Sequence, residues 1–341
     1  MHHQPAAILA FVLLLGTALV QGSPVQSGQI TTFEQFKAAF HKQYASAAEE
    51  ATRRANFAAS LAFIEANQGK LAGGVLLAIN ELSDLSDAEF AALSPAVNMT
   101  ISGEEEFYDI IHVNPERNLP AHFDWREKIR MPAAINQHTC GACWAFAAAT
   151  TIETQLAFRH NIHVELSKQE LVDCTRRASG YQNNGCHGGF PWEAFRFAQT
   201  HGLVDEHSYP YRGLDNEACL DSRMGGHQRY HVNGFHRLGL NAADEALMTV
   251  IKNHGPVSVH IMAHFDAFKH YRSGILRNIY PGTTHITHAV AIVGWGSEHG
   301  IDYWVMRNSW GPNYGEHGYV RVERHHNNIG LNNYVSFPVV N

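Results

Sequence analysis

The stretch that decides the fold is Gln137-His138-Thr139-Cys140-Gly141-Ala142-Cys143-Trp144-Ala145-Phe146. A turn at Cys140-Gly141-Ala142 leads into an alanine-rich segment, 144–160, whose apolar residues recur every four positions, as on one face of a helix. Cys143 therefore lies at or beside a helix N-terminus, where free N–H groups and the helix dipole favour a thiolate. Because the thiolate is the nucleophilic form of cysteine, this position suits a reactive residue.

Three interpretations of this cysteine pair remain open at this point. The pattern C-G-[SA]-C-[WY] is a known signature of a catalytic cysteine. The C-x-x-C spacing of Cys140 and Cys143 also occurs in redox sites of the thioredoxin kind. Both residues could instead be half-cystines of a secreted protein.

Length and composition indicate a globular, secreted chain. It has 341 residues, 45% of them hydrophobic. Residues 1–22 resemble a secretory signal peptide, since an apolar run at 6–20 is followed by small residues. The first 118 residues carry 6 Lys/Arg and 13 Asp/Glu, and the remainder carries 19 of each. Without a basic stripe or a second long apolar run, we predict no nucleic-acid partner and no membrane span.

The acidic front third is expected to be largely helical. Phe33, Phe36 and Phe40 lie on one helical face, and a second amphipathic helix is expected at 47–68. Asn98-Met99-Thr100 is an N-glycosylation sequon. Residues 101–118 contain three consecutive glutamates and little periodicity, so we predict an exposed linker there.

From residue 119 the pattern predicts helices first and strands second. Ser167 to Glu170 forms a capping-box sequence that opens a short helix. Further helices are expected at 191–200 and 241–253. Strands are expected at 257–261, 289–295, 303–307 and 318–322. The fold class is therefore α+β, divided into two lobes.

A cysteine nucleophile needs a base, and the base needs a third group to hold its tautomer. His288 stands at the head of an apolar strand, although a histidine there could equally be a hydrogen-bonded structural residue. Asn308 follows the next strand, where a turn residue is the alternative interpretation. Gln137 lies six residues before Cys143 and can donate an amide hydrogen to an oxyanion.

An ordered series of motifs identifies a family. The motifs are Gln137 with 140–146, then 166–174, Gly185-Cys186-His187-Gly188-Gly189, Tyr209-Pro210-Tyr211, His288-Ala289-Val290 and Asn308-Ser309-Trp310-Gly311. With this set, the chain resembles the papain-like cysteine proteases, including cathepsin L-type enzymes, over nearly all of residues 30–341. His288 follows Cys143 by 145 residues, inside the interval of roughly 130–150 expected for this family. Asn308 lies 165 residues after Cys143, beyond that interval, which suggests an extended intervening loop.

The resemblance implies a fold and a role for each site residue. The fold would be papain-like, with a helical left lobe and a β-barrel-like right lobe, preceded by a mostly helical propeptide. Cys143 would be the nucleophile and His288 the base, as a thiolate–imidazolium pair in the groove between the lobes. Asn308 would orient His288, and Trp310 would shield that contact. The Gln137 side chain and the Cys143 N–H would form the oxyanion hole.

The family pattern also sorts the five cysteines. It pairs Cys140 with Cys186 and Cys174 with Cys219, and it leaves Cys143 free. A third disulfide common in the family is missing, because Ile329 stands where one partner would be. Mite digestive proteases of the family lack it too, a weak hint of that subgroup. The redox interpretation weakens, since the Trp before and the Pro within the usual motif are absent.

The acidic front part resembles the inhibitory propeptide of the same family. The matching residues are Glu49, Arg53, Phe57, Ile64, Asn80 and Asp84. Ser60 and Gln68 replace two asparagines of that pattern. The expected divisions are a signal peptide at 1–22, an inhibitory propeptide at 23–118 and a catalytic domain at 119–341, with the activating cut within 107–119. Any release by acid would depend on specific contacts near Asp84.

The implied enzyme is a monomeric endopeptidase acting on proteins or peptides, with its own propeptide as intramolecular inhibitor and no cofactor or metal. The implied substrate-binding residues are Gly188, Gly189, Phe190, Pro191, His260, Ile286, Ala289, Trp310 and Tyr334. Apolar pocket walls predict an apolar side chain two residues before the cut, although His260 and Tyr334 replace small residues there. The alternative class is a non-catalytic relative that binds peptides or serves for storage. Expected locations are the lysosome, the extracellular space or a gut lumen.

Overall fold

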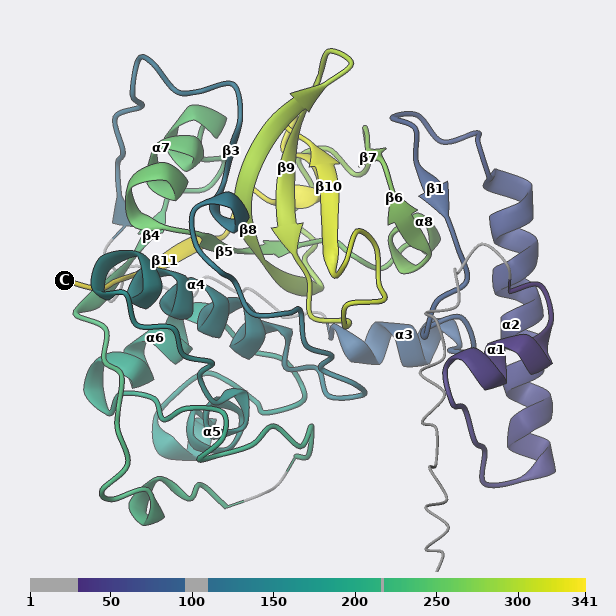
Figure 1. Cartoon of the computed structure of the whole chain (residues 1–341), viewed down its shortest axis with the longest axis horizontal. Coiled ribbons are helices and arrows are strands. Elements are labelled where there is room, and N and C mark those ends of the chain that lie inside the picture. The colour runs from purple at the N-terminus through teal and green to yellow at the C-terminus, as the bar shows by residue number, and fades with distance from the viewer. Residues whose placement is uncertain (1–29, 96–109, 216–217) are drawn as a thin grey trace, which may run out of the picture.

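The computed structural model describes residues 30–95, 110–215 and 218–341. The predicted signal peptide and the sequon at Asn98 lie outside the described residues. Figure 1 shows three groups of elements: two front helices at one side, a strongly curved sheet beside them, and a helical group below the sheet. None of the helices in this described part combines the length and apolarity that a membrane span requires.

The front third folds as a small helical unit around phenylalanine side chains. Its elements are α1 (Phe33–Ala39), α2 (Ala47–Asn67), β1 (Leu76–Leu77) and α3 (Asp87–Leu93). Capping boxes at Thr32 and Ser86 open α1 and α3. Phe36 is fully buried and packs against Phe33, Phe40 and Phe57. The predicted helical face thus forms the core of this unit.

The helical lobe is built on one long, buried helix. Its elements are η3 (Trp125–Glu127), α4 (Cys143–His160), α5 (Lys168–Cys174), η4 (Arg177–Ser179), α6 (Pro191–Thr200) and η5 (Asp221–Arg223). The many alanines of α4 let β8 and α6 approach it closely. Only half of the predicted capping box at Ser167 forms. The Ser167 hydroxyl accepts from the Glu170 N–H, but the Glu170 carboxylate accepts from the N–H of Val204 instead.

The second lobe is a curved, mainly antiparallel sheet. Its strands are β2 (Ile110–Ile111), β3 (Phe123–Asp124), β4 (Gly234–Leu238), β5 (Val257–Ile261), β6 (Tyr271–Ser273), β7 (Ile275–Leu276), β8 (His288–Glu298), β9 (Ile301–Arg307), β10 (Tyr319–Glu323) and β11 (Val335–Val339). Helices α7 (Asp244–His254) and α8 (Asp266–Lys269) and the turn η6 (Asn328–Gly330) accompany them. The main sheet runs β2-β4-β11-β5-β8-β9-β10-β7, with β3 paired to β8. Strand β6 pairs with β1 in a separate ribbon.

The centre of the sheet sets the position of the site. Strand β8 pairs with β5 and β9, and helices α4 and α7 contact it. Because β8 is enclosed on all sides, its first nine residues are buried. Its first residue, His288, lies next to Ala289, whose N–H contacts Cys143 at the start of α4.

Two sequence predictions differ from the structure in detail here. The helix expected at 241–253 forms, but it begins at Asp244. The linker predicted for 101–118 is exposed or half-buried over 110–118, as expected, but it also docks on the sheet, where β2 pairs with β4. The Glu116 carboxylate accepts hydrogen bonds from Lys252 and Asn253, both at 2.6 Å. These tertiary contacts leave no helical or strand periodicity from which they could be predicted.

Candidate active site

Cys143 opens α4 at the contact between the two lobes. The preceding Ala142 provides no side-chain cap, so the first N–H groups of α4 stay available to other acceptors. The Cys143 Sγ accepts a hydrogen bond from the Ala289 N–H at 3.4 Å, which joins the start of α4 to the start of β8. The side chain is buried, and Cys143 is the free cysteine of the described residues.

His288 is oriented by Asn308. The His288 Nε2 lies 2.7 Å from the Asn308 Oδ1, which also accepts from the Ser309 N–H. Since an amide oxygen only accepts, Nε2 carries the hydrogen, and Nδ1 is the free basic nitrogen of the neutral ring. Within the described residues, Nδ1 has no hydrogen-bond partner. It can therefore take a proton from a thiol.

Trp310 covers the pair of His288 and Asn308. Its ring stacks on the His288 ring with centroids 4.9 Å apart and planes 28° apart. Phe268 and Tyr314 pack edge-on against the same indole. Trp310 is 2% exposed, so this aromatic cluster keeps water from the hydrogen bond beneath it.

Burial sets the charge state of the pair. It raises the pKa of Cys143 to about 11, although the N–H groups of Ala289 and of the helix start act in the opposite direction. It lowers the pKa of His288 to about 3, although the hydrogen bond that the ring donates to Asn308 acts in the opposite direction. A neutral thiol and a neutral imidazole are therefore favoured in this closed state. The thiolate expected from the helix N-terminus is not favoured here, because desolvation outweighs the dipole.

Gln137 lies in the same site, with its side chain held at both ends. Its Oε1 accepts from the Ser309 hydroxyl at 2.5 Å. Its Nε2 donates to the carbonyl oxygens of Leu93 at 2.6 Å and Cys140 at 2.9 Å. Leu93 is the last residue of α3 in the front unit. Its carbonyl oxygen therefore accepts from the Gln137 amide group that the sequence analysis expected to donate to an oxyanion.

The front unit runs directly over this site. Asn80 donates to the Lys269 carbonyl at 2.7 Å, and the Ser94 hydroxyl lies 3.1 Å from the His264 Nε2. Pro95 packs so closely on Gly141 that a Cβ there would lie 2.6 Å from the proline ring. In Figure 1, α3 reaches from α1 and α2 toward the junction of α4 and the sheet. The front unit thus closes the site.

Most of the expected substrate-binding residues form one cluster. The His260 ring contacts the rings of Phe190 and Tyr334, and its Nε2 lies 3.4 Å from the Gly189 carbonyl oxygen. Burial lowers the pKa of His260 to about 4, so this ring is neutral at higher pH. Pro191 begins α6 directly after Phe190.

Glycines shape one wall of this cluster. A Cβ on Gly189 would lie 2.4 Å from the Asn183 Oδ1, and Gly188 has φ +97°. Ala289 lies on β8 beside Cys143. Ile286 is buried in the loop before β8, and no contact joins it to the aromatic cluster among the described interactions.

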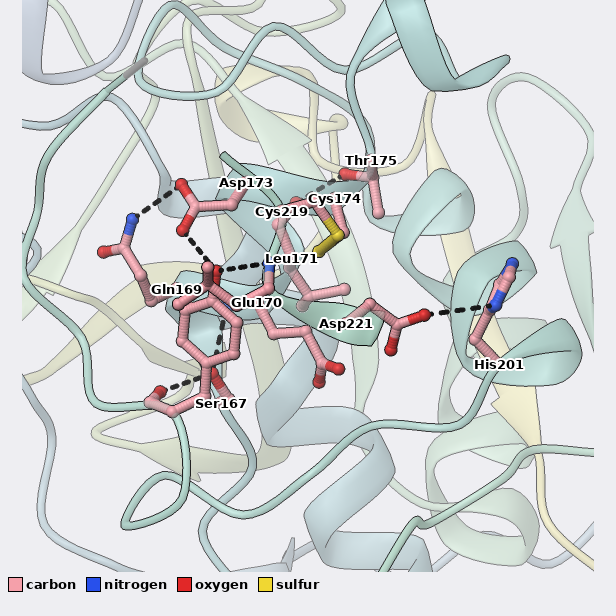
Figure 2. Close-up of a disulfide and its surroundings, with 12 residues drawn as sticks. Ser167, Gln169, Glu170, Leu171, Asp173, Cys174, Thr175, His201, Cys219 and Asp221 are labelled. Carbon is pink, nitrogen blue, oxygen red and sulfur yellow. Dashed lines mark hydrogen bonds and ion pairs between the residues drawn. A yellow bond between two sulfur atoms is a disulfide. The ribbon is translucent and has the colours of Figure 1, made fainter. Parts of the chain in front are cut away.

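Two disulfides stabilise the helical lobe. Cys140 is bonded to Cys186, and Cys174 to Cys219, the two pairs implied by the family pattern. Figure 2 shows the second bond at the end of α5, with Asp173 turned toward Gln169 and Asp221 toward His201. Ile329, at the position of the missing third disulfide, is fully buried.

Sequence reasoning missed several residues around the site. Leu93 acts through its backbone carbonyl, which no side-chain pattern reveals. Ser309 orients Gln137 from 172 positions away in sequence. His264 and His270 lie under the front unit, but nothing in the sequence distinguished them from the other histidines of this histidine-rich chain.

Comparison with known proteins gives the family. The profile of the papain family cysteine proteases matches residues 119–339, and that of the cathepsin propeptide inhibitor domain (I29) matches residues 33–90. The chain belongs to the papain family of cysteine proteases. It is a cysteine protease with a cathepsin-type propeptide, as the sequence motifs predicted.

Relatives cover nearly the whole chain. A cysteine protease of Blomia tropicalis is 42% identical over 92% of this chain and 93% of its own. Cathepsin S of Bos taurus is 33% identical over 90% and 92%. A solved structure concerning antibody cross-reactivity between the mite allergens Blo t 1 and Der p 1 superposes with a TM-score of 0.84 at 41% identity, covering 92% of this chain and 100% of that one. The mite-type resemblance and the papain-like α+β fold are confirmed.

A second structure shows the same arrangement with a propeptide. Digestive procathepsin L 3 from the larval midgut of Tenebrio molitor superposes with a TM-score of 0.79 at 30% identity, covering 90% of this chain and 97% of that chain. Residues 33–90 of this papain-family chain, whose Phe90 packs on Trp310, are therefore its propeptide. Leu93, just after them, contacts Gln137.

Proposed function

We propose that the chain is the zymogen of an endopeptidase that uses Cys143, His288 and Asn308. The hydrogen bond between His288 and Asn308, beside a Cys143 whose sulfur is held by the Ala289 N–H, is the observation that carries this proposal. Once the propeptide leaves, water reaches both groups and the desolvation that favours the neutral pair falls. The helix start and the imidazole then favour a thiolate–imidazolium pair.

The proposed reaction passes through a thioester. The Cys143 proton moves to the His288 Nδ1, and the sulfur attacks the peptide carbonyl carbon. The resulting oxyanion accepts hydrogen bonds from the Gln137 Nε2 and the Cys143 N–H. The carbon–nitrogen bond breaks as the amine takes the proton from His288, which leaves an acyl thioester on Cys143.

Water completes the cycle. His288 takes a proton from a water molecule, whose oxygen attacks the thioester carbon. The carbon–sulfur bond breaks, the carboxylic acid leaves, and the proton returns to the pair of Cys143 and His288. Asn308 keeps the imidazole facing the sulfur throughout, and Trp310 keeps that hydrogen bond dry.

We assign substrate binding to the cluster around His260. Gly188 and Gly189 would present backbone to an extended peptide, and Phe190, Ala289 and the neutral His260 would bind an apolar side chain two residues before the cut. Dipeptide substrates that vary this residue test the assignment, and a preference for a charged side chain would contradict it.

The finer assignments of the chain's divisions belong to the same proposal. We assign a signal peptide to 1–22, the propeptide to 23–118 and the catalytic domain to 119–341. A monomeric enzyme of the secretory pathway follows, active in a lysosome, a gut lumen or the extracellular space. The digestive relatives from Homarus americanus and the cathepsins support such destinations.

Activation of the zymogen tests the function directly. Residues 23–341 would be shifted from pH 7 to about pH 4.5 while a fluorogenic peptide is followed with and without a thiol-alkylating inhibitor. We expect activity to appear as the front third is lost, and to be absent with the inhibitor or in Cys143→Ala. Processing by an added protease with no activity afterwards would instead favour the non-catalytic alternative.

A further inference from the structure

The propeptide covers a small face made by β6 and α8 of the catalytic unit. Strand β1 pairs with β6, and the Ala78 N–H donates to the His270 carbonyl at 2.9 Å. Asn80 donates to the neighbouring Lys269 carbonyl. These backbone contacts fix the front unit directly over the side chain of His270, which is 1% exposed.

The surroundings of His270 offer no charge that could balance a proton. Its Nδ1 lies 3.5 Å from the Ser83 hydroxyl, and its ring lies 6.0 Å from the ring of Phe63, both on the propeptide. Within the catalytic unit, the charge that acts on His270 is the cation of Lys269, which opposes protonation of the imidazole. Among the described residues, His270 forms no ion pair.

The carboxylates nearby are directed elsewhere. Asp84, adjacent to Ser83, binds Lys42 at 3.0 Å and the Tyr44 hydroxyl at 2.9 Å, both within the propeptide. Lys269 donates to the Leu85 carbonyl at 2.8 Å. The more distant carboxylates of Asp266, Asp87, Asp84 and Glu89 act on Lys269 rather than on His270.

His264 repeats this arrangement at the other end of the face. Its Nε2 lies 3.1 Å from the Ser94 hydroxyl, and its ring lies 6.0 Å from the ring of Phe90. The charged neighbour that acts on it is His285, which also opposes protonation. The propeptide thus buries His270 and partly buries His264 against neutral groups.

We propose that His270, assisted by His264, is the group through which acid releases the propeptide; this inference rests on the proposed zymogen function. A protonated imidazole needs water or an anion around it, and the docked face offers neither. Protons therefore bind the undocked state in preference, and they pull the docking equilibrium toward release.

The sign follows from the two states. Burial lowers the pKa of docked His270 to about 3, whereas the ordinary pKa of an exposed histidine is about 6.5. Because the pKa is lower in the docked state, the imidazole takes up a proton on release. Docking is therefore strongest above pH 6.5 and weakens by up to about tenfold per pH unit as the pH falls toward 3.

This mechanism differs from the one that the sequence suggested at Asp84. The partners of Asp84 all belong to the propeptide, so protonating it would loosen the propeptide's own fold. Protonating His270 acts on the interface itself. Asp84→Asn and His270→Phe therefore separate the two routes.

The test compares His270→Phe with His163→Gln, a control at an exposed histidine in the loop after α4. The pH midpoint of processing is measured in the wild-type background. In a Cys143→Ala background, which has no catalysis, docking is followed by hydrogen exchange of the β1 amides. The exchange rates are corrected for their intrinsic dependence on pH. We expect His270→Phe to lower both midpoints by about one pH unit or more, and the control to lower neither.

Unchanged midpoints in His270→Phe would overturn the inference while leaving the protease function intact. Conversely, a wild-type chain without inhibitor-sensitive activity would overturn the proposed function, and the exchange midpoint would still test His270. His270→Leu, with thermal unfolding at pH 7, guards against a variant that fails to fold. His264→Gln combined with His270→Phe should lower the exchange midpoint further.

Discussion

At the residue scale, one amide connects inhibition with catalysis. The Gln137 Nε2 contacts the Leu93 carbonyl in the zymogen, and we assign the same donor to the oxyanion in the enzyme. Its Oε1 is held by the Ser309 hydroxyl, so the NH₂ group cannot turn away. With this assignment, the propeptide would inhibit the enzyme by binding a group that the proposed reaction needs.

Gln137→Ala should lower kcat of the mature enzyme by roughly 10²- to 10³-fold with little change in KM, because this donor acts on charge that develops in the transition state. Steady-state kinetics on a fluorogenic peptide measure both constants. Asn136→Ala is the matched control. It removes a bond to Glu81 of the propeptide and should leave the kinetics of the mature enzyme unchanged. A tenfold rise in KM at constant kcat would contradict the assignment to the oxyanion.

Sequence alone predicted candidate site residues that stand in fixed motifs. Cys143, His288, Asn308 and Gln137 were chosen because their spacing and flanking residues form a family pattern, and the structure brings them together. The charge state of the pair was not found, since it depends on how much surface the propeptide covers. Leu93 was missed because its contribution is a backbone carbonyl.

At the element scale, the propeptide is a unit with its own core. Phe36 is fully buried, with ring centroids 5.2 Å from both Phe40 and Phe57. The two family asparagines that the sequence lacks are replaced functionally. The Ser60 hydroxyl donates to the Ser83 carbonyl, and the Gln68 Oε1 accepts from the Leu77 N–H. These bonds attach α2 to the segment that lies on the enzyme.

Phe36→Ala should weaken the propeptide fold by about 3–5 kcal/mol, because it opens a cavity in a small core. Since each 1.4 kcal/mol is tenfold, basal activity of the zymogen at pH 7 should rise by at least about tenfold. Phe158→Ala, at a half-exposed phenylalanine of α4, is the matched control and should leave basal activity unchanged. Equal basal activity in the two variants would show that the phenylalanine core does not govern inhibition.

Long elements were predictable and short ones were not. Helix α4 and strands β5, β8 and β9 have strong periodicity or apolar runs, and their predicted bounds differ from the observed ones by three residues or fewer. Strands β1, β2 and β3 have two residues each and exist because a distant strand pairs with them. No local pattern encodes such pairing, so the docking of 110–118 was missed.

At the scale of the whole molecule, acid acts differently on the two lobes. Burial raises the pKa of Glu170 in α5 to about 7, against the opposing effects of the Val204 N–H and Arg229. It also raises the pKa of Asp173. A carboxyl with a raised pKa destabilises the fold as the pH rises, because it must ionise while buried. The helical lobe should therefore gain stability in the acid range in which we propose that the propeptide leaves.

Glu170→Gln should abolish much of the pH dependence of the stability of the helical lobe. Relative to its parent in a Cys143→Ala background, the variant should gain on the order of 2 kcal/mol between about pH 4.5 and pH 7.5. Denaturant unfolding at several pH values measures the difference. Glu165→Gln, at an exposed glutamate just before α5, is the matched control. If the difference in unfolding free energy between Glu170→Gln and its parent did not vary with pH, the raised pKa of Glu170 would be contradicted.

The covalent continuity of propeptide and enzyme has a further consequence. While the chain is intact, α3 and β1 face their binding surface at the millimolar effective concentration typical of short tethers. Inhibition of the zymogen is then independent of how dilute the protein is. A single cut within 107–119 turns the same contacts into an ordinary bimolecular complex. From that moment, dilution into a larger volume is itself an activator.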